Sequence, residues 1–149
     1  MYNIVMKIYL GADHRGYKLK EVLKEELKTQ GFEVEDMGAD IYDGTDDYVD
    51  YANKVCKKIG KDDRGILICG SGHGVDIVAN KHKQIRSILG FNLDVVVQGR
   101  EDEDANVLSL PAEWITADEA IEMVKVFIST DFSNAERHVR RLEKIEKLS

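Results

Sequence analysis

The sequence predicts an α/β fold, a three-layer α/β/α sandwich around a mainly parallel, Rossmann-like sheet. Short apolar strand patterns alternate with amphipathic helical patterns along the chain, an order that gives a sheet covered by helices on both faces. Residues 65–69 form a continuous apolar run, which is typical of a strand buried on both faces. The connections are too short for a second domain, so residues 1–149 are expected to form a single domain.

Strand patterns occur at four further places. Each is a short run rich in apolar or β-branched residues and is followed by a polar or glycine-containing turn. They cover residues 6–10, 32–34, 85–89 and 107–110.

Helical periodicity fills the segments between these strands. In residues 17–30, four apolar side chains recur at the spacing of one helical face, and Gly31 ends the pattern. The four are Leu19, Val22, Leu23 and Leu27. Further helices are expected over residues 48–59, 75–81, 93–101, 117–129 and 134–147. Residues 133–136 (Ser-Asn-Ala-Glu) match a capping box, so we expect the last helix to begin there.

Composition excludes several classes of protein. There are 28 acidic and 21 basic residues, and the net charge of −7 has the wrong sign for a protein that binds nucleic acid through its phosphates. No run of about 18 apolar residues suggests a membrane span. Cys56 and Cys69 are the only cysteines and lack zinc-ligand spacing. We therefore expect a cytoplasmic protein that binds neither nucleic acid nor membrane.

A glycine-rich turn follows the most apolar strand. Gly70, Gly72 and Gly74 alternate with other residues between this strand and the next helix. Such a turn lets backbone N–H groups approach an anion or a developing oxyanion. It also suits a tight strand-to-helix connection without any ligand. The spacing matches neither a dinucleotide fingerprint nor a P-loop.

Chemically active side chains are expected near the carboxyl ends of the strands. Cys69 ends the apolar strand, where N–H dipoles can make a thiol a nucleophile or base; the alternative is a small buried apolar residue. Ser71 either relays a proton or tightens the turn. His14 follows the first strand and is a candidate anion contact, whereas His73 is either a loop ligand or exposed to solvent.

The last helix carries a cluster of cations. Arg137 and Arg141 are four residues apart and share one face. A cation in the first turn opposes the helix dipole, which a bound anion would explain; the alternative is a solvated charged face. The acidic runs at residues 43–50 and 101–104 match no calcium-loop spacing and are interpreted as solvated turns.

Seven motifs occur in order along the chain. They are GADHRG at residues 11–16, DYVDYA at 47–52, GILICGSGHG at 65–74, ANK at 79–81, IR at 85–86, DANVL at 104–108 and RHVRR at 137–141. In this combination the sequence resembles the ribose-5-phosphate isomerase B family and the related galactose-6-phosphate isomerases.

The resemblance implies an aldose-ketose isomerase that interconverts ribose 5-phosphate and ribulose 5-phosphate through a cis-enediolate, without metal or cofactor. It implies that Cys69 is the base and that Ser71 assists it. The implied substrate-binding residues are Asp13, His14, Tyr48, Gly70, Gly72, His73, Gly74, Asn80, Asn106, Arg137 and Arg141. Members of this family are usually dimers or tetramers with shared sites, so we expect a homodimer or homotetramer.

The chain departs from the family pattern at functional positions. Asp102 stands where the family has a His associated with ring opening, and we expect Asp102 to take over that role. Glu103 replaces an Asn, Glu113 an Arg that commonly touches phosphate, and Val49 a Pro. Another sugar phosphate as substrate, or a non-catalytic sugar-phosphate-binding module, is therefore an open alternative. Architecture alone also admits a flavodoxin-like nucleotide or flavin binder.

Overall fold

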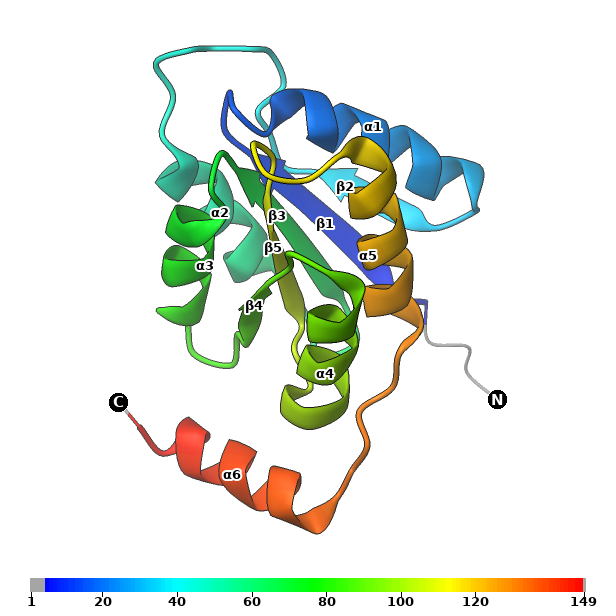
Figure 1. Cartoon of the computed structure of the whole chain (residues 1–149). Helices are drawn as coiled ribbons and strands as arrows, with labels where there is room; N and C mark the ends of the chain where they lie inside the picture. Colours follow the sequence, from blue (N-terminus) through cyan, green and yellow to red (C-terminus); the bar gives the residue numbers. More distant parts are fainter. Residues whose placement is uncertain (1–4, 149) are drawn as a thin grey trace.

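Five parallel strands form one sheet in the order β2-β1-β3-β5-β4, with helices on both of its faces (Figure 1). The structure is a computed structural model that describes residues 5–148. The strands are β1 (Lys7–Ala12), β2 (Glu33–Asp36), β3 (Arg64–Cys69), β4 (Ser87–Leu89) and β5 (Val107–Pro111). The helices are α1 (Tyr17–Thr29), α2 (Tyr48–Lys58), α3 (His73–Asn80), α4 (Leu93–Glu103), α5 (Ala117–Ser129) and α6 (Glu136–Glu146). The predicted α/β architecture is confirmed. Among the described residues, no helix is long and apolar enough to cross a bilayer.

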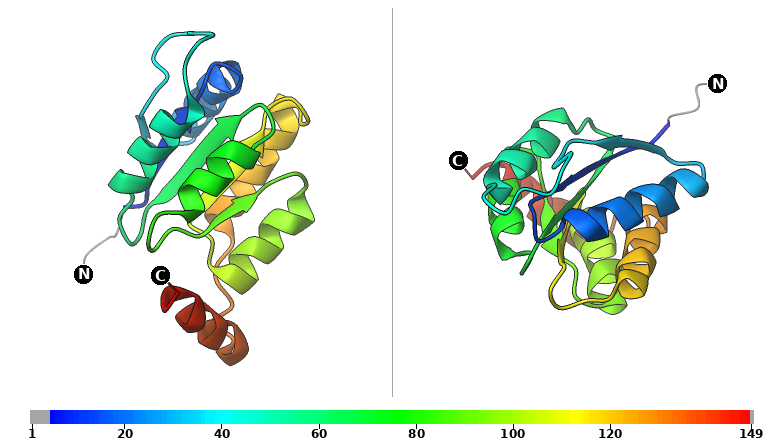
Figure 2. Two further views of the ribbon diagram at one scale, coloured as in Figure 1. Left: turned by 90° about the vertical axis from the view of Figure 1, so that its left-hand side faces the viewer. Right: turned by 90° about the horizontal axis from the view of Figure 1, so that it is seen from above.

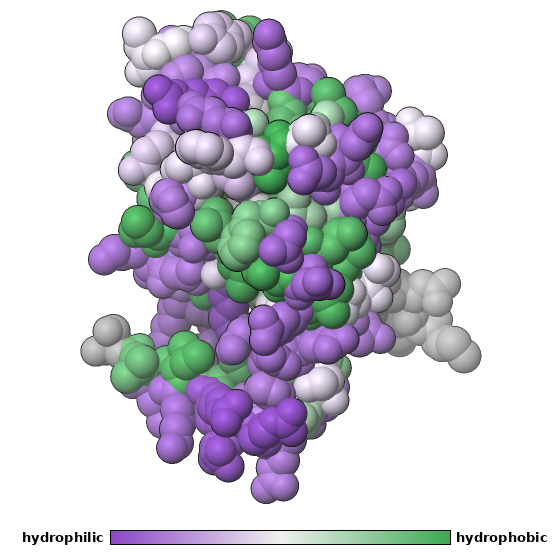
Figure 3. Space-filling model, in the orientation of Figure 1, coloured by the Kyte–Doolittle hydropathy of each residue, from purple (hydrophilic) through white to green (hydrophobic). Residues whose placement is uncertain are grey.

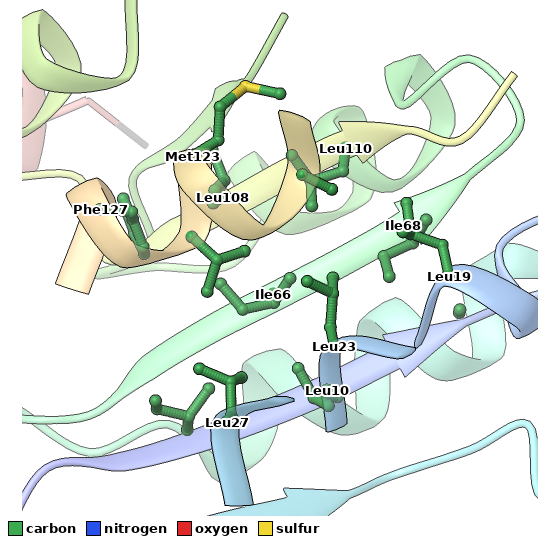
Figure 4. Packing of buried hydrophobic residues seen from close by; sticks show 14 of the residues in the cluster. Leu10, Leu19, Leu23, Leu27, Ile66, Ile68, Leu108, Leu110, Met123 and Phe127 are labelled. Carbon is green, nitrogen blue, oxygen red and sulfur yellow. The ribbon is translucent and has the colours of Figure 1, made fainter. Parts of the chain in front are cut away.

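The core lies on both faces of the sheet, as the continuous apolar run of β3 predicts. Ile66 and Ile68 pack with α1, α4 and α5, while Leu67 and Cys69 pack with α2 and α3. Alternate side chains of a strand point to opposite faces, so a strand covered on both sides needs apolar residues at every position. Figure 4 shows the first of these clusters, and Figure 2 shows how the two helical layers enclose the sheet.

Helix α1 buries three of the four apolar side chains of the expected face. Leu19, Leu23 and Leu27 are buried, but Val22 is 43% exposed and Lys20 is completely buried. The row of leucines at every fourth position faces the sheet, and the flank that carries Lys20 turns toward the end of β2. The expectation for Val22 was therefore wrong, because a polar partner on β2 selects the other flank.

That partner is Asp36, the last residue of β2. Its Oδ2 lies 2.6 Å from Lys20 Nζ and 2.9 Å from Lys24 Nζ, and its Oδ1 accepts the N–H of Gly38 at 2.9 Å. Burial alone would raise the pKa of Asp36, but the hydrogen bonds from the two lysines outweigh it and lower this pKa. The contacts fix the start of the loop over residues 37–47 that leads to α2.

The turn between β3 and α3 depends on Gly72, which caps α3 with a φ of 76°. A Cβ atom at this position would lie 2.5 Å from Leu89 Cδ1 and 3.1 Å from the backbone of Leu110 and Pro111. The left-handed conformation and the lack of space both require glycine. Helix α3 therefore begins at His73, two residues earlier than the periodicity predicts.

Helix α6 does not begin with the expected capping box. Its N-cap is Ala135, which has no side chain able to cap, and Ser133 Oγ accepts the N–H of Ala135 at 3.2 Å instead. The N–H of Ser133 is donated to Glu101 O of α4, and Asn134 has a φ of 58°. Tethering to α4 thus takes Ser133 out of the capping position. The helix lies beyond α4, away from the sheet (Figure 2).

We predict that Asp36→Asn lowers the free energy of unfolding by about 1–3 kcal/mol near pH 7, since buried Lys20 loses a charged partner. The folded state lowers the pKa of Asp36. The stability that the Asp36 carboxylate contributes is therefore fully present above its ordinary pKa of 3.8 and is lost as the pH falls through the lowered pKa of the folded state. Urea unfolding at several pH values should show less acid destabilisation in Asp36→Asn than in the parent. Asp40→Asn, at an exposed position nearby, serves as the control. Parallel pH profiles for Asp36→Asn and the parent would contradict the prediction.

Gly72→Ala should destabilise the protein more than Gly31→Ala. Both glycines have positive φ angles, 76° and 88°, but nothing lies within 4 Å of a Cβ at Gly31. The two substitutions share a backbone cost of about 1–2 kcal/mol, and only Gly72→Ala adds an overpacking cost of about 1–3 kcal/mol. Urea unfolding of the two variants and the parent gives the free energies of unfolding for this comparison. An equal loss of stability in both variants would contradict the prediction that a Cβ atom at position 72 is overpacked.

Candidate active site

The register of the sheet brings three loops together at its carboxyl edge. Ala12 pairs with Ile68, and Cys69 pairs with Pro111. The segments that follow β1, β3 and β5 therefore leave the sheet side by side, as expected for parallel strands.

Cys69 lies at the centre of this edge. Its side chain is buried, and its Sγ accepts the N–H of Gly72 at 3.2 Å. An N–H donor aimed at sulfur stabilises negative charge there. Cys56, the other cysteine, lies on the buried face of α2, where burial raises its pKa to about 12. Of the two thiols, Cys69 has the surroundings of a base.

The glycine-rich loop is held from three directions. Ser71 Oγ accepts the N–H of His73 at 3.2 Å, and Gly70 O accepts the N–H of Glu113 at 3.0 Å. A Cβ on Gly74 would lie 2.5 Å from Cζ of Tyr48, so the Tyr48 ring packs directly on the loop. The structure thus places Cys69 with Tyr48 and the loop residues, while the side chain of His73 is exposed.

Asp13 and His14 form the wall next to this loop. Asp13 is 5% exposed, and its Oδ1 accepts the N–H groups of Arg15 at 3.0 Å and Gly16 at 3.2 Å. Burial raises the pKa of Asp13, which these two hydrogen bonds oppose. His14 Nδ1 lies 2.8 Å from Asp46 Oδ1. Both residues therefore belong to the carboxyl edge, as predicted.

Asp46 corrects the interpretation of the acidic run at residues 43–50. The run was expected to be a solvated turn, yet the side chain of Asp46 is only 6% exposed and contacts His14. Asp13, His14 and Asp46 bring three potential metal ligands within 4.8 Å of one another. The hydrogen bonds among them, and from backbone N–H groups to Asp13, already account for this proximity. No local pattern distinguishes Asp46 from its acidic neighbours, because its partner is 32 residues away.

Asn80 and Asn106 lie at the opposite, amino edge of the sheet. Asn80 exchanges hydrogen bonds of 2.8 and 3.0 Å with the backbone of Ser87. Asn106 accepts the N–H of Arg86 at 2.8 Å and donates to Gln84 O at 2.9 Å. Within the subunit both amides organise the approach to β4, and their role toward substrate stays a prediction.

The remaining predicted residues also lie at the amino edge. Asp102 is near the end of α4, and its Oδ1 is 3.3 Å from Nε2 of His138, a buried residue of the RHVRR motif on α6 to which the sequence analysis assigned no role. Arg137 and Arg141 are exposed on α6. At about 3.3 Å per residue, β3 alone separates the two edges by roughly 15 Å. One subunit therefore does not bring Asp102 or these arginines to its own Cys69.

Glu113 faces the glycine-rich loop and pairs with Arg15. Their closest atoms are 2.8 Å apart. A Cβ on Gly70 would lie 2.6 Å from Glu113 Oε1 and 2.8 Å from Arg15 Cδ, so the ion pair sits directly over Gly70. At the position where the family resemblance led us to expect an arginine, the side chain is thus an acid paired with the cation of Arg15, from the loop after β1.

Comparisons with known proteins agree with this geometry. The profile of the family described as Ribose/Galactose Isomerase matches residues 8–145. The probable ribose-5-phosphate isomerase B of Mycoplasma genitalium is 40% identical over 141 residues, which cover 93% of this chain and 92% of that protein.

Solved structures give the same result for the fold. Ribose 5-phosphate isomerase B of Thermotoga maritima superposes with a TM-score of 0.92 at 40% identity, covering 96% of this chain and 99% of that one. The Mycoplasma genitalium enzyme with bound ribulose-5-phosphate gives 0.90 at 38% identity, covering 97% of each chain. Since the family profile spans residues 8–145 and relatives of 40% identity cover nearly the whole chain, this protein belongs to the ribose/galactose isomerase family.

Proposed function

We propose that the protein interconverts ribose 5-phosphate and ribulose 5-phosphate through a cis-enediolate, with Cys69 as the base. The observation that carries this proposal is the hydrogen bond of 3.2 Å from Gly72 N–H to Cys69 Sγ in a loop rich in N–H donors. A base beside oxyanion donors is what enediolate chemistry requires. The similar structure with bound ribulose-5-phosphate supports the choice of substrate.

The proton transfers balance within the substrate. In the aldose, the thiolate of Cys69 removes the proton from C2, and the electron pair moves to the carbonyl oxygen on C1. The resulting enediolate is stabilised by N–H groups of the loop and by the N-terminus of α3. Ser71, whose oxygen already accepts the N–H of His73, keeps its own proton for transfer between O1 and O2. Return of the proton to C1 gives the ketose and regenerates the thiolate.

A second copy of the chain completes the site in this proposal. Cys69 and His14 lie at the carboxyl edge, whereas Asp102, Arg137 and Arg141 lie at the amino edge. In a homodimer that places the carboxyl edge of each subunit against α6 of its partner, the two groups of residues meet. Two-fold symmetry then gives two identical sites per dimer.

The surface of α6 suits such an interface. Ile145 and Leu148 are 47% and 75% exposed, and Figure 3 shows this apolar patch at the C-terminal end of an otherwise hydrophilic helix. The same residues line a groove of about 820 Å³ together with Ile77 of α3. Packing against a second subunit would remove this apolar surface from water.

In the dimer, Arg137 and Arg141 of one subunit and His14 of the other hold the substrate phosphate. Asp102, which contacts His138, is the candidate for proton transfer during ring opening. Both cysteines are free thiols, which favours a reducing cytoplasm.

The pairing of Glu113 with Arg15 favours a second candidate function, the isomerisation of a different sugar phosphate. An acid in place of a phosphate-contacting arginine changes the charge at the edge of the site. An isomerase assay over a panel of pentose and hexose phosphates tests both candidates. The highest kcat/KM should be found with ribose 5-phosphate; turnover of another sugar alone would favour the second candidate, and no turnover at all a binding module.

Cys69→Ala should lower kcat for ribose 5-phosphate by at least about 100-fold, because the reaction loses its positioned base. Cys56→Ala is the matched control: it removes the other buried thiol and should leave kcat close to that of the parent. Steady-state assays of both variants, with circular dichroism to verify folding, make the comparison. Turnover of Cys69→Ala near the parental rate would remove Cys69 from the mechanism.

Arg137→Ala should mainly raise KM for ribose 5-phosphate, since a charge-assisted contact to phosphate contributes about 1.5–3 kcal/mol. Inhibition by inorganic phosphate should weaken in parallel. Arg140→Ala removes the same charge from the same helix and should change neither quantity. Equal phosphate inhibition of Arg137→Ala and the parent would contradict the assignment.

A further inference from the structure

The side chain of Asp46 is buried although it lies in a run of exposed acidic residues. Its side chain is 6% exposed, whereas Asp43 and Asp47 on either side are exposed. Burying a carboxylate costs free energy unless hydrogen bonds or an opposite charge compensate it. The position therefore requires a specific partner.

That partner is His14, which Asp46 contacts twice. Asp46 Oδ1 accepts the backbone N–H of His14 at 3.0 Å and lies 2.8 Å from its Nδ1. An ionised carboxylate only accepts hydrogen bonds, so Nδ1 carries the proton in this contact. One oxygen atom thus fixes both the backbone and the ring of His14, and it leaves Nε2 as the ring nitrogen for a ligand.

Aromatic residues complete the surroundings of the pair. The Tyr42 ring meets the His14 ring edge-on with 6.0 Å between centroids. Tyr51 also interacts with Asp46: burial, the negative charge of Asp46 and a side-chain hydrogen bond to Asp46 raise the pKa of Tyr51. Asp46 Oδ2 is buried without a hydrogen-bond partner of good geometry among residues 5–148. The hydrogen bonds of good geometry to the Asp46 carboxylate are thus those from His14.

The loop that carries Asp46 is anchored at its start by β1 and at its end by α2. Ala12 N–H donates to Gly38 O and Ala39 N–H donates to Ala12 O, both at 2.9 Å. Tyr48 begins α2 two residues after Asp46. Anchoring at both ends makes Asp46 a fixed reference for the His14 ring.

We propose that Asp46 is a positioning residue for the isomerase reaction. It holds the His14 ring with Nδ1–H toward its own carboxylate, so that Nε2 is presented to the phosphate of the substrate. This inference rests on the phosphate role proposed for His14 above, and it adds a residue outside the predicted site.

Asp46→Ala should raise both KM for ribose 5-phosphate and the inhibition constant of inorganic phosphate by about 10- to 100-fold, the scale of one charge-assisted hydrogen bond. The change in kcat should be smaller, because the base and its loop are untouched. Asp46→Asn keeps an acceptor oxygen and should recover part of the loss. Asp40→Asn removes the same charge from an exposed position of the same loop and should behave like the parent.

A double-mutant cycle separates this inference from the phosphate role of His14. If Asp46 acts through His14, adding Asp46→Ala to His14→Ala should raise KM no further. Additive losses, or an unchanged KM in Asp46→Ala when His14→Ala weakens binding, would overturn the role of Asp46. Unchanged phosphate inhibition in His14→Ala would instead refute the phosphate role of His14.

The tautomer of His14 gives a measurement that needs no variant. Long-range ¹H–¹⁵N NMR spectra of the parent protein, recorded above the usual titration range of histidine, should show the proton of the His14 ring on Nδ1. A ring protonated on Nε2 would overturn the proposal.

Discussion

The parallel pairing of β1 with β3 is the constraint on which the site depends. Because Ala12 lies opposite Ile68, the next residues along each strand, Asp13 and Cys69, leave the sheet at the same edge. The pairing of Cys69 with Pro111 adds the loop after β5. A shift of one residue in either register would turn alternate side chains of the shifted strand to the other face and move its last residues along the edge. The register thus assembles the carboxyl edge.

Buried polar contacts then fix the loops that the sheet brings together. Lys20 and Asp36 hold the start of the loop after β2. Behind the glycine-rich turn, Asp76 accepts the hydroxyl of Ser87 at 2.6 Å, and Ser87 lies 2.8 Å from Ser109. Burial raises the pKa of Asp76, and the hydrogen bonds from these serines oppose the shift. Apolar side chains at these positions would also fill the space. They would not fix the course of a loop as ion pairs and hydrogen bonds do, because apolar contacts have no preferred direction.

Charge at the carboxyl edge is arranged in pairs. His14 faces Asp46, and Arg15 faces Glu113. The two arginines of the proposed phosphate site, Arg137 and Arg141, lie on α6 at the other end of the subunit. In the proposed dimer they would meet the anionic substrate at the carboxyl edge of the partner subunit. This separation gives oligomerisation a chemical role in the proposed reaction.

The sequence by itself determined the order of strands and helices, the buried strand that ends at Cys69 and the glycine-rich turn, because periodicity and turn chemistry act over a few neighbouring residues. Only the tertiary structure decided that Lys20 is buried in place of Val22 and that the side chain of Asp46 is buried in contact with His14. It likewise decided that Asp102 lies at the edge opposite Cys69. Asp36 follows Lys20 by 16 residues and Asp46 follows His14 by 32. A contact between residues so far apart leaves no local pattern, since its free energy arises only after the sheet has brought the two segments together.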